Sequence, residues 1–536
     1  MTTRRPQTIL FRALSVVLLC GITVRAAETP QPSLQHATAF GAGRVSLPAP
    51  GSYATVQPAP LNLPPSSEFK LVYQVLGIGN GFPNYMVAAG EPDATLAVGG
   101  SEVVQAASVS YADFDKSTGA IIPLSGQDST FGNTIWHNLI PGTLCANHND
   151  GVQVKFDRAA SRWVVTQNVY ESPYAVCIAV SQTPTFSDNL WFAYQFPVLQ
   201  SGFPNTPFFG VWATGGPSDG YFQTWNNFGP GGGGFVGAVM CGYHRAKLLA
   251  GDPSAEQICF QLSANDTYLL PADLDSPVGP PATEDEFFIG GVDAVDNSHL
   301  SLYSMEIDDW ASGSATMTGL NNSQLIAVEP YMGACNGQFG GNCIPPGGLN
   351  SSGGQLMYRF AYWDDRPSPT VTAAPPIPPP LQHWLVNFAV ESPTGQVGVR
   401  WFEFIASHRT VPVTSLSVFQ QGTFAGSPAD TNYRWVGSIA RDNVQDILLG
   451  YSISSSSMYP SIAVAGRKYN DPQGTLSGEQ FAVMGTGPGS SWSTYSTMEI
   501  DPSDNCTFFF TSEYYTVNAG FNWSTDISSW KFPNCH

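Results

Sequence analysis

Residues 91–115 read EPDATLAVGGSEVVQAASVSYADFD and contain three short runs rich in apolar and β-branched residues. The glycines at positions 99 and 100 separate the first run from the second, and the third run ends at Asp115. Runs of this composition, bounded by glycine and aspartate, are typical of strands joined by tight turns. The stretch therefore predicts consecutive antiparallel strands.

The same unit recurs along the chain: an apolar strand, a turn marked by Asp, Asn or Gly, a second strand, and one or two more. After residues 91–115, it is found at 150–170, 208–228, 286–307, 355–365 with 383–405, 434–454 and 495–515. Helical patterns are scarce and limited to residues 243–250 and part of 264–274. Seven units of roughly 65 residues predict an all-β chain, most simply a single β-propeller with seven four-stranded blades. Six or eight blades are the alternatives.

Three segments lie outside these units. Phe69–Leu76 (FKLVYQVL) has a strand pattern but precedes the first unit, so we expect it to complete the last blade. Residues 366–382, RPSPTVTAAPPIPPPLQ, are interpreted as a loop insertion because proline cannot donate to a ladder; a domain linker is the alternative. Residues 27–66 are rich in Pro, Ser, Ala and Gly and predict a flexible or extended leader. The propeller domain then spans 67–536.

The first 26 residues have the pattern of a cleavable signal peptide. Three arginines precede an uncharged apolar stretch, residues 13–24, and cleavage is expected after Ala26. The stretch is shorter than the roughly 20 residues that a membrane-spanning helix needs. A twin-arginine signal and a lipoprotein signal are the alternatives. The pattern predicts a protein that is secreted, periplasmic or at the cell surface, with no membrane span after cleavage.

The cysteines agree with that compartment. One of the nine lies in the signal segment, which leaves an even number, typical of disulfides in an exported chain. The simplest pairing is sequential, and no CxxC or His-rich cluster suggests a metal site instead. The predicted pairs are Cys145–Cys177, Cys241–Cys259, Cys335–Cys343 and Cys506–Cys535.

Composition limits the partners. The chain has 12% charged residues and a formal net charge of −20, and loss of the four signal-segment arginines would lower it to −24. Such a charge repels nucleic acid and anionic lipid, so neither is an expected partner. An extracellular carbohydrate or another surface ligand is the expected partner.

The chain resembles a widespread group of secreted bacterial β-propeller proteins for which no activity is established. The segments that carry the likeness include DGVQVKFDRAASRWVVTQ, RWVGSIARDNVQDILLGYSISSSSMYPSIAVAGR and WSTDISSWKFPNC, and it runs from about residue 90 to the end. The resemblance implies fold and export but transfers no catalytic residue. After Tyr362 this chain has the proline-rich tract where the group has a polar loop with His and Asn.

Propellers bind ligands where the innermost strands converge, so polar residues at the entrances of these strands are the candidate site. An acid pair such as Asp93 and Asp150 suits glycoside cleavage, and a Tyr, His and Arg set suits polysaccharide elimination. Acids that cap turns and accept backbone hydrogen bonds are the structural alternative. Glu513, an ionisable group in an apolar strand, is either catalytic or a strand residue satisfied by a partner. The candidate residues are Glu91, Asp93, His148, Asp150, Arg434, Tyr495 and Glu513.

No cofactor is evident from the sequence. Aspartates in DPSDN (residues 501–505) and DAVDN (residues 293–297) are of the type that binds Ca²⁺. Neither segment follows a complete calcium-loop pattern, so turn formation is the favoured interpretation.

Three functions stay open. The first is a recognition protein for carbohydrate or envelope and matrix material, favoured because no catalytic constellation is visible. The second is a carbohydrate-active enzyme, either a glycoside hydrolase or a polysaccharide lyase, with its site at the central channel. The third is a structural envelope protein. Converging acids, or Tyr, His and Arg in one pocket, would favour the enzyme.

Overall fold

The computed structural model describes residues 30–44, 68–83, 85–87, 90–123, 135–136, 139, 142–146, 151–231, 233–290, 297–319, 325–336, 341–366, 380–407, 411–426, 429–517 and 522–536. These residues form an all-β structure with one short α-helix, α1 (Arg245–Ala250). No helix among them is long and apolar enough to cross a membrane. The predicted signal peptide lies outside the described residues.

The first sheets follow the chain order and consist of antiparallel neighbours. One contains β4 (Thr95–Val98), β5 (Glu102–Ala107), β6 (Ser110–Asp115) and β7 (Ile121–Ile122). The next contains β8 (Gln153–Asp157), β9 (Arg162–Val169), β10 (Ala175–Ser181) and β11 (Leu190–Pro197). A further sheet contains β12 (Phe203–Trp212), β13 (Gly220–Phe228), β14 (Phe235–His244) and β15 (Glu256–Gln261).

Two further meanders are joined by one parallel pairing. The first comprises β16 (Leu270–Leu274), β17 (Glu286–Gly290), β18 (His299–Asp309) and β19 (Ser314–Thr318), with β20 (Leu325–Ala327) beside β18. The second comprises β24 (Met357–Asp364), β25 (Leu381–Glu391), β26 (Val397–Ser407) and β27 (Ser417–Phe424), with β21 (Met332–Gly333) beside β25. β16 and β24 pair in parallel, and β22 (Asn342–Ile344) and β23 (Leu349–Asn350) form a small separate hairpin.

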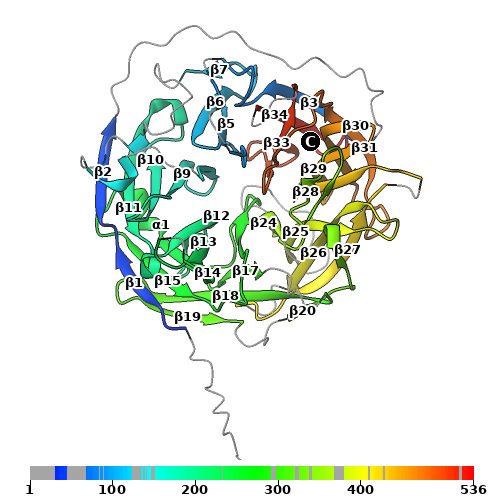
Figure 1. Ribbon diagram of the computed structural model, residues 1–536. Helices are drawn as coiled ribbons and strands as arrows, with labels where there is room; N and C mark the ends of the chain where they lie inside the picture. The colour runs from blue at the N-terminus through cyan, green and yellow to red at the C-terminus, as the bar shows by residue number, and fades with distance from the viewer. Residues whose placement is uncertain are drawn as a thin grey trace, which may run out of the picture.

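The remaining strands form two sheets. One contains β28 (Tyr433–Arg441), β29 (Ile447–Ser455), β30 (Met458–Arg467) and β31 (Ser477–Val483). The other contains β32 (Thr497–Ile500), β33 (Thr507–Tyr515), β34 (Trp523–Lys531) and β3 (Lys70–Leu76). Figure 1 shows the sheets around a common centre, with β3 in blue next to the red β34. The arrangement is propeller-like.

The prediction for Phe69–Leu76 is confirmed, because β3 pairs antiparallel with β34. Side chains reinforce the pairing: Gln74 Nε2 donates a hydrogen bond to Asp526 Oδ1 at 3.0 Å. The last sheet therefore combines strands from both ends of the described chain, which covers the free edge of β34.

All four predicted disulfides are present, with the sequential pairing. Cys506, directly before β33, is joined to Cys535, which follows β34. The last segment of the chain is thus covalently attached to the sheet that β3 completes.

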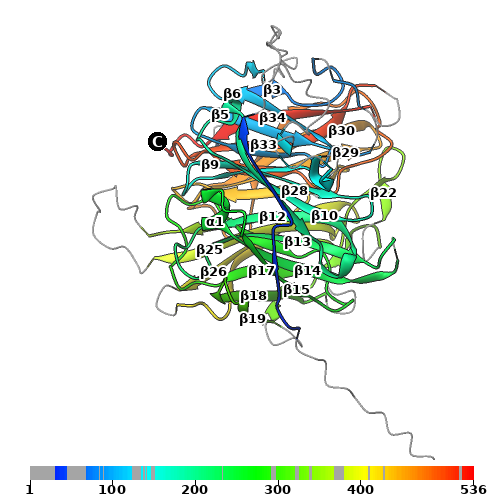
Figure 2. The same cartoon turned by 90° about the vertical axis from the view of Figure 1, so that its left-hand side faces the viewer.

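The predicted leader is not free of structure. Residues 33–44, here called the N-terminal strap, contain β1 (Ser33–His36) and β2 (Ala39–Arg44). β1 pairs with β15 and β2 pairs with β11, so the strap extends two adjacent sheets at their outer edges. Figure 2 shows the strap in dark blue across these edges. Sequence analysis assigned no strand here.

The helix prediction was correct for part of residues 243–250 and wrong for 264–274. α1 covers Arg245–Ala250, whereas Leu270–Leu274 is strand β16. β16 lies between β17 and β24, and these neighbours fix it as a strand.

The proline-rich tract joins β24 and β25, which are adjacent antiparallel strands; residues 367–379 lie outside the described part.

Close packing explains the glycine at position 99, in the turn between β4 and β5. A Cβ atom on Gly99 would lie 2.5 Å from the ring of Trp163, a fully buried side chain of β9. The turn after β4 thus packs directly against the next sheet, and a larger residue would push the two sheets apart.

Candidate functional site

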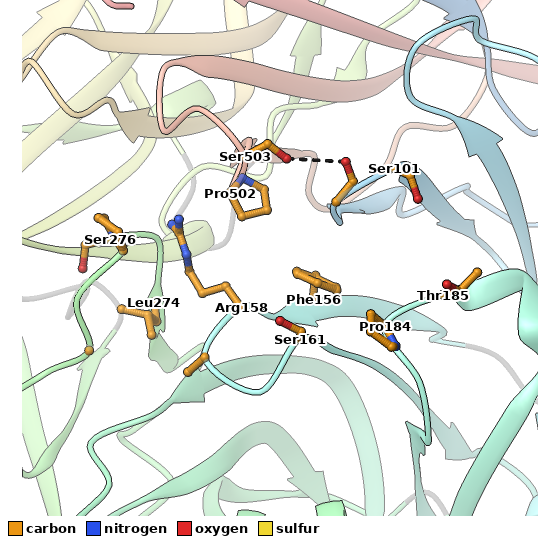
Figure 3. A pocket seen from close by; sticks show the side chains of 14 residues that line it. Ser101, Phe156, Arg158, Ser161, Pro184, Thr185, Leu274, Ser276, Pro502 and Ser503 are labelled. Carbon is orange, nitrogen blue, oxygen red and sulfur yellow. Dashed lines mark hydrogen bonds between the residues drawn. The ribbon is translucent and has the colours of Figure 1, made fainter. Parts of the chain in front are cut away.

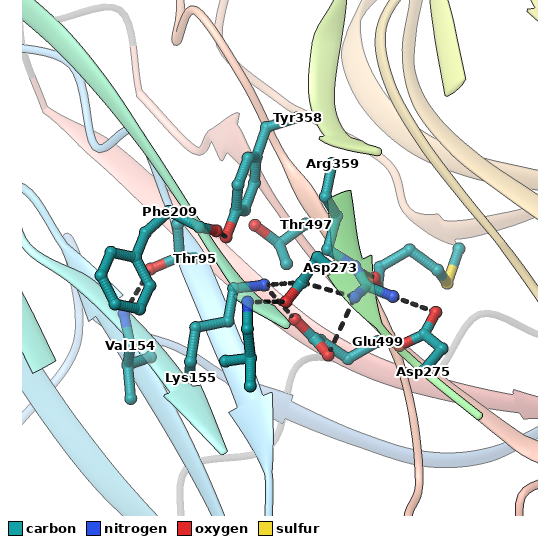
Figure 4. A network of polar contacts seen from close by, with 12 residues as sticks. Thr95, Val154, Lys155, Phe209, Asp273, Asp275, Tyr358, Arg359, Thr497 and Glu499 are labelled. Carbon is teal, nitrogen blue, oxygen red and sulfur yellow. Dashed lines mark hydrogen bonds and ion pairs between the residues drawn. The ribbon is translucent and has the colours of Figure 1, made fainter. Parts of the chain in front are cut away.

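The first strands of four meanders bring charged side chains together (Figure 4). Lys155 of β8 contacts Asp273 of β16 at 2.5 Å and Glu499 of β32 at 2.7 Å. Arg359 of β24 contacts Asp273 at 2.7 Å and Glu499 at 3.5 Å, and it also pairs with Asp275. We call these five residues the central ion network.

Burial and pairing act in opposite directions in this network. Burial opposes the charged form of Lys155, but Asp273 and Glu499 outweigh it and raise the pKa of the ammonium. Burial likewise disfavours ionised Asp273, yet Lys155 and Arg359 hold its pKa below the usual value. These side chains therefore stabilise one another in their charged forms. Such an arrangement suits a structural role better than acid–base catalysis.

Asp275 differs from the other carboxylates of the network. Burial raises its pKa to about 7, with Glu499 and Asp273 adding to the rise and Arg359 opposing it. It lies just beyond the end of β16, between Leu274 and Ser276, two residues that line a pocket.

The pocket has a volume of about 460 Å³ and lies where the turns after β4, β8, β16 and β32 meet (Figure 3). Its walls combine hydroxyl groups, backbone, proline rings, one aromatic ring and one guanidinium. The lining residues are Gly100, Ser101, Phe156, Arg158, Ala159, Ser161, Pro184, Thr185, Leu274, Ser276, Pro277, Gly279, Pro502 and Ser503. Among them Arg158 is the one ionisable side chain.

Arg158 follows β8 and is half-buried on the pocket wall. Its Nη2 donates a hydrogen bond to Asn505 Oδ1, and no ion pair joins it to a carboxylate of the described residues. Burial lowers the pKa of the guanidinium to about 10, although Asp275, Asp501 and Glu499 act in the opposite direction. The pocket thus presents a guanidinium that has no direct ion pair among the described residues.

Four of the predicted site residues lie near the starts of β4 and β32, the ends of these strands opposite to the pocket. They are Glu91, Asp93, Tyr495 and Glu513. Asp93 Oδ1 accepts hydrogen bonds from Thr494 N at 2.7 Å and Thr494 Oγ1 at 3.0 Å. Ser491 Oγ donates to Glu91, and Ser493 N donates to Glu513 Oε1 at 2.5 Å. Each of these acids is thus engaged with the segment that precedes β32.

Glu513 and Tyr495 are the most deeply placed of the four. Burial raises the pKa of Glu513 well above its usual value, and the nearby Asp93 and Glu91 add to the rise. Burial also raises the pKa of Tyr495, whose hydroxyl accepts a hydrogen bond from Gln153 Nε2 at 3.4 Å. For both side chains burial therefore favours the neutral form. A catalytic role for them stays a prediction.

The other predicted residues do not join this group. Arg434 contacts Glu479 at 2.7 Å and also Asp430, in a separate groove of about 490 Å³ between β27 and β31. His148 and Asp150 lie outside the described residues.

No group of three His, Cys, Asp or Glu side chains that could hold a metal is present in the described part of the chain. Asp504 instead accepts backbone hydrogen bonds from Cys506 and Thr507 at 2.9 Å each, as in a turn. Asp501 accepts one from Ser503 N at 2.8 Å. The aspartates at 293 and 296 lie outside the described residues.

Sequence reasoning missed the central ion network and Arg158. One signal was available: in a chain with few charges, Lys155 and Glu499 stand inside apolar strand runs, VQVKFD and TMEI. Partnership could not be seen, because these two residues are 344 positions apart in the sequence.

No family model and no curated protein sequence matches the chain. It is similar to a protein of unknown function from Dyadobacter fermentans, with 9% identity and a TM-score of 0.37 over 87% of this chain and 99% of that one. The Hadza microbial sialidase Hz136 shows 9% identity and a TM-score of 0.34 over 80% and 73% of the two chains. An exo-β-1,3-galactanase from Clostridium thermocellum shows 9% and 0.30 over 84% and 88%. TM-scores this low do not support an inference about function, which must therefore come from the site.

Proposed function

We propose that this chain is an exported, seven-bladed β-propeller that recognises a carbohydrate in the pocket at the end of its central channel. The blade number is supported by seven antiparallel meanders among the described residues, the last of which is completed when β3 pairs with β34. Export is supported by the four disulfides, which persist in oxidising compartments.

The composition of the pocket carries the proposal for carbohydrate. A volume of about 460 Å³ suits a small ligand, and hydroxyl groups from Ser101, Ser161 and Ser503 line it together with the ring of Phe156. Hydroxyl and backbone groups match the hydroxyls of a sugar, and an apolar face matches the C–H face of a sugar ring. This is a lining that orients a polar ligand by hydrogen bonds.

Recognition is favoured over catalysis because the described pocket lining contains no carboxylate, histidine or tyrosine. Hydrolysis of a glycoside needs two carboxyl groups that flank the bond. The acids at the opposite ends of the inner strands, such as Asp93 and Glu513, are engaged in hydrogen bonds with the protein itself.

A glycan array with the purified mature chain tests the proposal, with simultaneous detection of newly released reducing or unsaturated ends. We expect binding without release. Ser101→Trp fills the pocket and should weaken binding about tenfold or more, whereas Ser312→Trp, on the exposed turn between β18 and β19, should not. Absence of binding to any glycan, or equal binding by the two variants, would refute the recognition function. Release of sugar ends would establish the enzyme instead.

A further inference from the structure

Arg158 gives the pocket a feature that a site for neutral sugars does not need. Its guanidinium has five N–H donors, and the described residues provide one acceptor, Asn505 Oδ1. In Figure 3 the side chain stands on the pocket wall between Ser276 and Pro502. The remaining donors are therefore available to a ligand in the pocket.

Other arginines of the described chain show how this protein normally balances a buried guanidinium. Arg245 contacts Asp157 at 2.7 Å and Asp219 at 3.0 Å, and Arg434 also contacts two carboxylates. Arg158 lacks such a pair among the described residues. Leaving a half-buried cation without a direct counter-ion costs free energy unless a ligand supplies the anion.

The carboxylates whose charges act on Arg158 are Asp275, Asp501 and Glu499, and each is paired with another cation. Arg359 pairs with Asp275, and Lys116 Nζ contacts Asp501 at 2.9 Å. They reduce the cost of placing Arg158 there, but each forms its direct ion pair with another cation. An anionic group from outside would therefore meet a guanidinium with unused donors and no carboxylate on the described pocket wall.

From this geometry we infer that the ligand is an acidic carbohydrate whose carboxylate binds the Arg158 guanidinium. The inference rests on the proposed recognition function and names the class of ligand. A planar carboxylate matches the fork of guanidinium N–H groups, and the pair forms two charge-assisted hydrogen bonds. Sugar hydroxyls then face the serine hydroxyls of the lining. Overall charge cannot produce this preference, because a chain with a net charge of −20 repels acidic sugars.

Calorimetry with a trigalacturonic acid and its carboxyl-reduced, neutral counterpart tests the inference at constant ionic strength. The natural chain should bind the acidic trisaccharide about tenfold or more tightly than the neutral one. Arg158→Gln should remove this preference. Arg162→Gln is the matched control: it removes the same charge four residues away, where Arg162 Nη1 donates to backbone oxygens and does not line the pocket.

The outcomes separate this inference from the proposed function. Equal binding of the two trisaccharides, or an unchanged preference in Arg158→Gln, overturns the acidic ligand. If only neutral glycans bind, and Ser101→Trp abolishes their binding, the acidic ligand is wrong while recognition stands. Failure of every glycan to bind overturns both. Loss of the preference in Arg162→Gln as well would assign it to general electrostatics and overturn the role of Arg158.

Discussion

Replacing Asp526 with asparagine should make the stability of the protein less sensitive to pH between about 4 and 8. Asp526 lies in β34, is buried, and has one oxygen, Oδ2, without a hydrogen-bond partner among the described residues. Burial raises its pKa from 3.8 to about 7, partly offset by hydrogen bonds from Gln74 and Ser528. Asparagine resembles the protonated carboxyl in shape and stays neutral at every pH.

The sign and size follow from the two pKa values. The folded chain holds this proton up to about pH 7, whereas the unfolded chain releases it near 3.8. Stability is therefore lost as the pH rises through this window. Three pKa units at 1.36 kcal/mol each correspond to roughly 4 kcal/mol, an upper value for one group. At pH 4 the two proteins should be similar, and at pH 8 the variant should be more stable by a few kcal/mol.

Urea unfolding followed by tryptophan fluorescence, with disulfides intact, measures this difference at pH 4, 6 and 8. Other buried acids with raised pKa values, such as Asp285 and Asp442, should lower the stability of both proteins as the pH rises. Only the difference between the two curves is diagnostic. Glu171→Gln, at an exposed position before β10, controls for loss of one negative charge. Parallel curves for the natural chain and Asp526→Asn from pH 4 to 8 would refute the reasoning.

Three further variants test the packing. Arg359→Met leaves buried carboxylates without their cation and should lower the free energy of unfolding by about 3–5 kcal/mol; an unchanged urea midpoint would contradict this role. The double replacement Cys506→Ser and Cys535→Ser should lower it by roughly 2–4 kcal/mol, measured by urea unfolding without reductant. Gly99→Ala should lower the melting temperature, because the added Cβ meets the Trp163 ring, at a cost of about 1–3 kcal/mol. A thermal unfolding curve identical to that of the natural chain would show that the turn adapts.

Strands whose own residues form apolar, β-branched runs bounded by turn residues were predictable from sequence. Residues 91–115 form β4, β5 and β6, with the turn at the glycines where expected. The strap was missed because its segments, SLQH and AFGAGR, have little strand character of their own. They are extended because β15 and β11 offer free edges, and backbone pairing of that kind depends on tertiary context.

The candidate site was harder to predict than the fold. Of the polar residues predicted at strand entrances, Asp93 and Tyr495 lie close together, whereas the guanidinium of Arg434 contacts Glu479. Glu513, predicted from its place in an apolar strand, lies near Asp93. Successive side chains of a strand point to opposite faces, so a position near an entrance does not fix the direction. Arg158 gave no signal, since a single arginine after a strand also suits a solvated turn.

The pairing of β3 with β34 also has a consequence for the order of folding. Gln74 and Asp526, which it brings together, are 452 residues apart in the sequence. Contacts of such separation slow folding, because the entropy of a very long loop is lost before they form. Each meander can form locally as it leaves the ribosome. The last sheet is complete only when β3, made at the beginning, pairs with β34, made at the end. Until then the edge of β34 is open, and this interval is when the chain is most exposed to pairing with another copy.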